Sequence, residues 1–119
     1  MAIDSTSESN AAVSDEPVHV DGQQGLAEIV GDNDVVLADF YADWCGPCQM
    51  LEPVVAAVAA DTAATVVKVD VDVNQQLAAA YGIRGVPTLV LFADGEPVEK
   101  LVGMQAEDQL RDTIETYSA

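Results

Sequence analysis

The centre of this 119-residue chain reads Ala38-Asp39-Phe40-Tyr41-Ala42-Asp43-Trp44-Cys45-Gly46-Pro47-Cys48. This segment joins an apolar run to a stretch with apolar residues at helical spacing, and it contains both cysteines of the chain. Two cysteines three positions apart can close only a small ring, which restrains little of the unfolded chain. A purely stabilising disulfide is therefore a poor explanation for the pair, and a reversible disulfide is a better one.

Zinc binding is the alternative explanation for two cysteines at this spacing. Tetrahedral zinc needs four ligands, and many zinc sites take two of them from such a pair. The chain has no third cysteine, and its one histidine, His19, belongs to a distant predicted strand. We therefore expect no metal, except at a site shared between molecules, and favour redox chemistry.

The position of the two cysteines at a helix start predicts different roles for them. A cysteine there faces unpaired N–H groups and the positive end of the helix dipole, which stabilise a thiolate. Cys45 is therefore the predicted nucleophile. Cys48, one turn later and more shielded, is the predicted resolving thiol. Gly46 and Pro47 carry no bulky side chain, and proline fits the first helical turn.

Asp39 is unusual because it interrupts a strand-like apolar run. Burying an ionised carboxylate is costly, so its pKa should rise. A hydrogen-bonded core carboxylate, or one that reaches the strand end, would explain it without any function. The alternative is a proton acceptor for Cys48. Lys68, equally odd among valines, is the predicted partner of Asp39 on the adjacent strand.

The rest of the pattern predicts an α/β fold with three layers, α/β/α, around a central mixed sheet. Apolar residues of both parities in 35–41 indicate a strand covered on both faces. A turn at Ala93-Asp94-Gly95 predicts an antiparallel hairpin. Asp21 and Asn74 are predicted helix caps, Gly31-Asp32-Asn33 a turn, and Pro53 a helix kink. The predicted order is βαβαβαββα, with strands 18–20, 35–41, 66–71, 88–92 and 98–102 and a last helix 107–117.

Charge excludes several classes of partner. The chain has 21 acidic residues against four Lys and Arg, for a formal net charge of −17. Binding to nucleic acid or to an anionic membrane is therefore not expected. Proteins that work in molar salt tolerate such self-repulsion, because screening there acts over about 3 Å. We hypothesise a halophilic source; an acidic surface that selects basic partners is the alternative.

The length fits one domain, predicted over residues 17–119. Residues 1–16 are polar and acidic, with neither the cationic nor the apolar part of a secretion signal, and are predicted to be a disordered tail. The longest apolar run, Val54 to Ala60, is too short to cross a bilayer, which needs about 18 residues. A cytoplasmic location is expected.

The central segment resembles the active-site segment of the thioredoxin family. The resemblance continues at Pro53, where the family kinks its active-site helix, and at Lys68, where it keeps a strand lysine. It extends to Arg84-Gly85-Val86-Pro87-Thr88, which is similar to the family's cis-proline loop, and to Gly103 after the last strand. The similarity covers about residues 17–119. Three departures are Tyr41, where many relatives have Trp, Gln49, where Lys is common, and the acidic N-terminal tail, which is extra and is assigned no function.

The resemblance implies a thioredoxin fold and a general protein-disulfide reductase, an electron carrier without a cofactor of its own. Its implied partners are a thioredoxin reductase and disulfide-containing target proteins, and a monomer is expected. It also implies a cis Val86-Pro87 bond and strand-like pairing of targets with Val86. The implied target groove consists of Trp44, Gly46, Pro47, Gly85, Val86, Pro87 and Gly103.

Two rival functions follow from the same residues. A non-catalytic binding module would use the groove to hold a partner enzyme, but the intact cysteine pair with Asp39 makes this the weaker choice. An oxidase or isomerase outside the cytosol is disfavoured by the dipeptide between the cysteines and by the absence of a signal-like segment.

Overall fold

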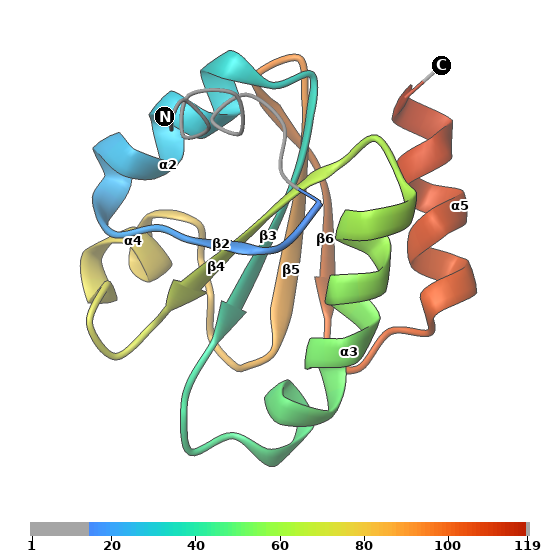
Figure 1. The fold of residues 1–119 in the computed structure, drawn as a ribbon. Helices are drawn as coiled ribbons and strands as arrows, with labels where there is room; N and C mark the ends of the chain where they lie inside the picture. The colour runs from blue at the N-terminus through green and yellow to red at the C-terminus, as the bar shows by residue number, and fades with distance from the viewer. Residues whose placement is uncertain (1–14, 119) are drawn as a thin grey trace, which may run out of the picture.

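The computed structural model describes residues 15–118, so the predicted tail lies outside the described residues except for Asp15 and Glu16. The predicted order βαβαβαββα is confirmed (Figure 1). The elements are β2 (Val18–His19), α2 (Gly22–Asp32), β3 (Val35–Tyr41), α3 (Gly46–Asp61), β4 (Thr65–Asp70), α4 (Gln75–Ala80), β5 (Thr88–Ala93), β6 (Glu96–Val102) and α5 (Glu107–Ser118).

The five strands form one mixed sheet in the order β2-β4-β3-β5-β6. β4 is parallel to both of its neighbours, β2 and β3, whereas β5 is antiparallel to both of its neighbours, β3 and β6. Helices α3 and α5 cover one face and α2 and α4 the other (Figure 1). The three-layer α/β/α prediction is therefore confirmed.

Strand β3 lies at the centre of the sheet, and all seven of its residues are buried. Val35 and Leu37 pack with residues of α3 and α5, whereas Val36, Ala38 and Phe40 pack with residues of α2 and α4. Because side chains alternate along a strand, Asp39 belongs to the α3 face. Apolar residues stand at both odd and even positions of this strand because helices cover both faces of the sheet.

Helix α3 continues through Pro53. Proline has no N–H to offer the carbonyl one turn earlier, which weakens the helix at that point. In Figure 1 the first turns of α3 are set off from the axis of the remaining turns, as the predicted kink requires. This bend places the start of the helix at the end of the sheet where β3 ends.

The ends of two helices differ from the prediction. Helix α2 extends through Gly31 and Asp32, because the turn begins only at Asn33, whose side-chain amide donates to the carbonyl of Ile29 at 2.9 Å. The amide oxygen of Asn74 does not cap α4. It accepts the backbone N–H of Gly22 at 2.7 Å and thereby caps α2.

The hairpin between β5 and β6 has the predicted two-residue turn. Asp94 and Gly95 have φ angles of 52° and 87°, which are the left-handed values that such turns require. Beyond the turn, the register of β5 and β6 shifts between Leu91 and Phe92, where Phe92 lies opposite Pro97. β6 is therefore an irregular strand at one edge of the sheet.

Candidate active site

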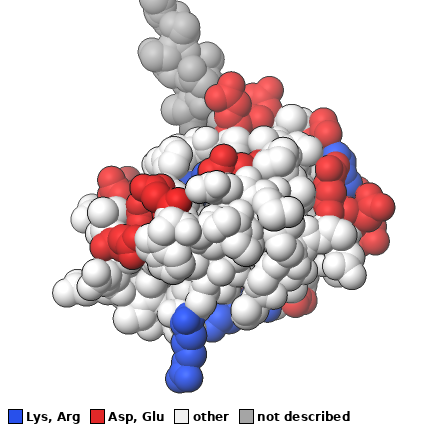
Figure 2. All heavy atoms as spheres, turned by 90° about the horizontal axis from the view of Figure 1, so that it is seen from below, with Lys and Arg blue, Asp and Glu red and all other residues white. Residues whose placement is uncertain are grey.

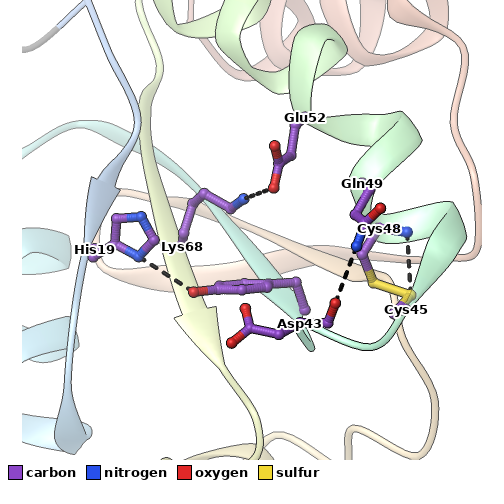
Figure 3. Close-up of polar contacts among 8 residues, drawn as sticks. His19, Asp43, Cys45, Cys48, Gln49, Glu52 and Lys68 are labelled. Carbon is purple, nitrogen blue, oxygen red and sulfur yellow. Dashed lines mark hydrogen bonds and ion pairs between the residues drawn. A yellow bond between two sulfur atoms is a disulfide. The ribbon is translucent and has the colours of Figure 1, made fainter.

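Cys45 and Cys48 form a disulfide at the first turn of α3 (Figure 3). Cys45 is the N-cap residue, and its Sγ accepts the backbone N–H of Cys48 at 3.1 Å. An anionic sulfur at this position would be stabilised by that N–H and by the helix dipole. Both cysteines are buried in this disulfide form, at 4% and 3% exposure, so the predicted contrast in shielding is not observed.

Asp39 is buried with both carboxylate oxygens lacking a hydrogen-bond partner among the described residues. Burial raises its pKa from 3.8 to about 6, while the Lys68 ammonium opposes and the Glu52 carboxylate reinforces the rise. The prediction of a raised pKa is confirmed, and a hydrogen-bonded core role does not fit. A carboxyl with this pKa can both accept and release a proton near neutral pH.

Lys68 is directly opposite Asp39 in the register of β3 and β4, as expected for the adjacent strand. Its ammonium, however, lies 3.3 Å from a carboxylate oxygen of Glu52 on α3 and 4.3 Å from the centre of the Tyr41 ring (Figure 3). Lys68 therefore acts on Asp39 through its charge, which lowers the pKa of the carboxyl, and the two side chains form no ion pair. The reason is competition, because Glu52 and Tyr41 together satisfy the ammonium.

Trp44 precedes the cysteines and exposes 71% of its surface. Its indole N–H donates to the Asp72 carboxylate, which follows β4, at 2.9 Å. This bond holds an otherwise exposed ring at the rim of the cysteine pair. Asp72 was not among the predicted site residues, since nothing in the sequence pairs it with a tryptophan 28 positions earlier.

The proline loop lies against the cysteines, as the resemblance implied. The Val86-Pro87 peptide bond is cis, and Val86 packs on the buried cluster that includes Tyr41 and both cysteines. The loop is tied to the end of β6, because Gly103 donates its N–H to the Pro87 carbonyl at 2.8 Å. Gly103 has a φ of +89°, which suits glycine.

Glu52 is the second residue that the sequence interpretation missed. It lies four residues after Cys48, so helical periodicity places both on the same side of α3. That spacing was a usable signal. His19 lies beside Tyr41, with its Nδ1 3.3 Å from the Tyr41 hydroxyl.

Figure 2 views the molecule from the end at which α3 begins. Uncharged residues fill the centre of this view, and acidic side chains gather mainly at its rim. Large apolar side chains remain exposed despite the acidic composition, namely Val18, Trp44, Met50, Val73, Val102 and Met104.

Within residues 15–118, no three His, Cys, Asp or Glu side chains are grouped so as to hold a metal ion. None of the helices in this part of the chain has the length and apolar character needed to cross a membrane.

Comparison with known proteins shows close relatives. The thioredoxin family profile matches residues 17–116. A structure of a mutant thioredoxin from Halobacterium salinarum has 66% identity and a TM-score of 0.89, and the match covers 92% of this chain and 96% of that one. Thioredoxin of Staphylococcus aureus is 45% identical over 85 residues, which is 70% of this chain and 82% of that protein.

A more distant solved structure agrees with these matches. Thioredoxin from Malassezia sympodialis is 33% identical, with a TM-score of 0.78, and the match covers 87% of this chain and 92% of that one. The matched region includes the buried Asp39, the cysteine pair and the cis-proline loop. The chain therefore belongs to the thioredoxin family and is a protein-disulfide oxidoreductase whose redox-active pair is Cys45 and Cys48.

Proposed function

We propose the following roles for the site residues in the reduction of a target disulfide. The Cys45 thiolate attacks one sulfur of the target, forming a mixed disulfide and releasing the other target sulfur as a thiolate. Cys48 then loses its proton to Asp39 and attacks Cys45, which closes the Cys45–Cys48 disulfide and releases the second target thiolate. The target gains the two electrons that the cysteine pair loses.

The observation that carries this proposal is the contact between Cys45 Sγ and the Cys48 N–H at the start of α3. It stabilises negative charge on Cys45, which suits both an attacking and a leaving sulfur. Asp39 supports the second step, because its unpaired oxygens and a pKa of about 6 make it a competent base near neutral pH.

The experiment is a pair of matched substitutions assayed on the disulfides of insulin. Cys45→Ser should abolish reduction, because no thiolate remains to attack. Cys48→Ser should still attack and should accumulate mixed disulfides with target proteins, visible as a mass increase that a reductant reverses. Full activity of Cys45→Ser would disprove the mechanism.

We propose that targets bind across Trp44, Gly46, Pro47 and the proline loop. The exposed indole of Trp44 and the partly exposed Val86 beside the cysteines support this groove. Trp44→Ala should weaken target binding by about 2 kcal/mol, the usual scale for a central interface tryptophan. Met50→Ala, which removes another exposed apolar side chain outside the proposed groove, is the control and should change the KM for insulin little.

We further propose a thioredoxin reductase as the electron donor, with the cytoplasm as the location and a monomer as the working form. Compartments that keep thiols reduced suit a disulfide reductase. Reduction of the Cys45–Cys48 disulfide by a purified reductase, cell fractionation and gel filtration test these three points separately.

We also propose that the acidic surface is an adaptation to molar salt. The formal charge of −17 and the 66% identity to the Halobacterium salinarum protein support it. The melting temperature should fall markedly when salt is reduced to tens of millimolar, because the self-repulsion is then no longer screened. An unchanged melting temperature would contradict the adaptation.

A further inference from the structure

Glu52 is an acidic side chain beside the active site that the proposed mechanism does not use. It is on α3, one helical turn after Cys48. Its carboxylate oxygen lies 3.3 Å from the Lys68 ammonium, and the two side chains expose 56% and 8% of their surface, respectively. A nearly buried ammonium is thus held by a carboxylate that reaches in from the surface (Figure 3).

Lys68 has a second carboxylate within its neighbourhood. Asp39 is its direct partner in the strand register, and both residues belong to the α3 face of the sheet. The ammonium nevertheless contacts Glu52 and the Tyr41 ring, and both oxygens of Asp39 lack a hydrogen-bond partner within residues 15–118. The ammonium therefore forms an ion pair with Glu52 and none with Asp39.

The charge around Asp39 depends on few groups. The charged neighbours that act on it are Lys68 from β4 and Glu52 from α3. Its register neighbour on β5 is Leu89, and α5 faces this side of the sheet through apolar residues. The other titratable groups toward this side in residues 15–118 are the disulfide-bonded Cys45 and Cys48 and the phenol of Tyr41, with His19 and Asp43 lining the same pocket as Glu52 and Lys68.

We propose that Glu52 is a positioning residue for the proton transfer at Cys48, because its carboxylate holds the Lys68 ammonium away from Asp39. The proposal rests on the role of Asp39 proposed above. If the ammonium turned to Asp39, it would stabilise the ionised carboxylate and make it a weaker base. Glu52 also adds a negative charge of its own, which acts in the same direction.

The test compares Glu52→Gln with a control variant on the same helix. Glu52→Gln keeps the size of the side chain but releases the ammonium, so the pKa of Asp39 should fall from about 6 toward 3.8. Asp61→Asn also removes an ion-paired acid from α3, the one that binds Arg111, and should leave the pKa of Asp39 unchanged. Carboxyl NMR titration of the disulfide form reads this pKa without interference, because the cysteines do not titrate there.

A double-mutant cycle asks whether Glu52 acts through Lys68. In a Lys68→Met background no ammonium remains to be held, so Glu52→Gln should lower the pKa of Asp39 by much less than it does with Lys68 present. An equal fall in both backgrounds would overturn the proposal, as would no fall in the single variant.

The kinetic readout separates this inference from the role of Asp39 itself. The rate at which Cys48 resolves a mixed disulfide should depend on pH through Asp39, and Glu52→Gln should move that inflection to lower pH in parallel with the NMR titration. If the titration moves and the inflection does not, then Glu52 still orients Lys68, but Asp39 is not the proton acceptor and the positioning role is refuted.

Discussion

The two faces of the central sheet are equally well buried, yet only one of them carries buried charge. Phe40 and Asp39 are neighbours on β3 with 0% and 1% exposure, and they point to opposite faces. The α2 and α4 side is filled by apolar side chains, with Tyr81 5.5 Å from Phe92 and 6.2 Å from Phe40. The α3 and α5 side holds Asp39 and Lys68.

This difference distinguishes the side chains that stabilise the fold from those proposed to act in the reaction. Apolar burial stabilises a fold on either face, whereas an unpaired buried carboxylate costs stability. The chain retains that cost only on the face that α3 covers, at the end where the cysteines lie. We call the side covered by α2 and α4 the aromatic face and the side covered by α3 and α5 the charged face. Apolar burial on the aromatic face therefore offsets the stability that the unpaired carboxylate costs on the charged face.

The substitution Phe40→Ala should have the largest effect on stability. It removes a fully buried ring from the aromatic face and should lower the free energy of unfolding by about 3–5 kcal/mol. Denaturant unfolding measures the loss. The pH dependence of insulin reduction by the folded fraction should stay unchanged, since no group near the cysteines is altered; a moved profile would show that the two faces are not independent.

The substitution Asp39→Asn should raise the free energy of unfolding, whereas Phe40→Ala lowers it. With its pKa raised from 3.8 to about 6, the folded chain holds the Asp39 proton more tightly than the unfolded chain does. Stability from this group is thus fully present below pH 3.8 and declines until pH exceeds about 6, a total of about 3 kcal/mol. The amide mimics the protonated acid, so the variant should be about 3 kcal/mol more stable at neutral pH.

Unfolding at acidic pH provides the control for Asp39→Asn. Below pH 3.8 both proteins carry an uncharged group at this position, so the gain in stability should vanish. A gain of equal size at both pH values would mean that packing, not charge, is responsible. The resolving step should meanwhile slow by roughly a hundredfold or more at neutral pH, as expected when a general base is removed.

The substitution Lys68→Met should change the pKa of Asp39 without unfolding the protein. The ammonium lowers the pKa of Asp39, so its loss should raise that pKa above about 6 and move the inflection of the resolving rate to higher pH. This shift is opposite to that expected for Glu52→Gln. A downward shift in the NMR titration would show that Lys68 does not act as a charge on Asp39.

The smallest effect is expected for charges outside both faces. Arg111 on α5 binds Asp61 and Glu107 at 2.8 and 2.6 Å at the protein surface. Exposed ion pairs contribute little, and molar salt screens them further. Arg111→Gln should leave both the denaturation midpoint and the pH profile unchanged, which thermal unfolding at high and low salt can check.

The order of elements could be predicted because local signals agreed with the global fold. The unbroken apolar run of β3, the Asp94-Gly95 turn and Pro53 each act over a few residues, and each was found where expected. The helix ends were predicted less well. Asn74 caps α2, which lies about fifty positions away, and no local pattern reveals a cap that comes from another part of the chain.

The sequence indicated candidate residues for the site better than it indicated which of these side chains contact each other. The cysteines and Val86 of the proline loop do converge in one buried cluster, and Asp39 lies opposite Leu89, two residues after Pro87. The choice of Lys68 between two carboxylates depends on side-chain reach and on the Tyr41 ring, which spacing does not encode. The similar burial of both cysteines likewise depends on the neighbouring Val86 and Ala42.

The irregular outer strand β6 has a consequence for the addition of strands from other chains. An edge strand offers free backbone groups to other chains, and charged side chains are the common defence. In molar salt such charges are screened over about 3 Å, so Glu96, Glu99 and Lys100 repel weakly there. Pro97, which has no N–H, and the register shift opposite it obstruct strand addition at any ionic strength. Steric protection of this edge therefore persists where electrostatic protection fails.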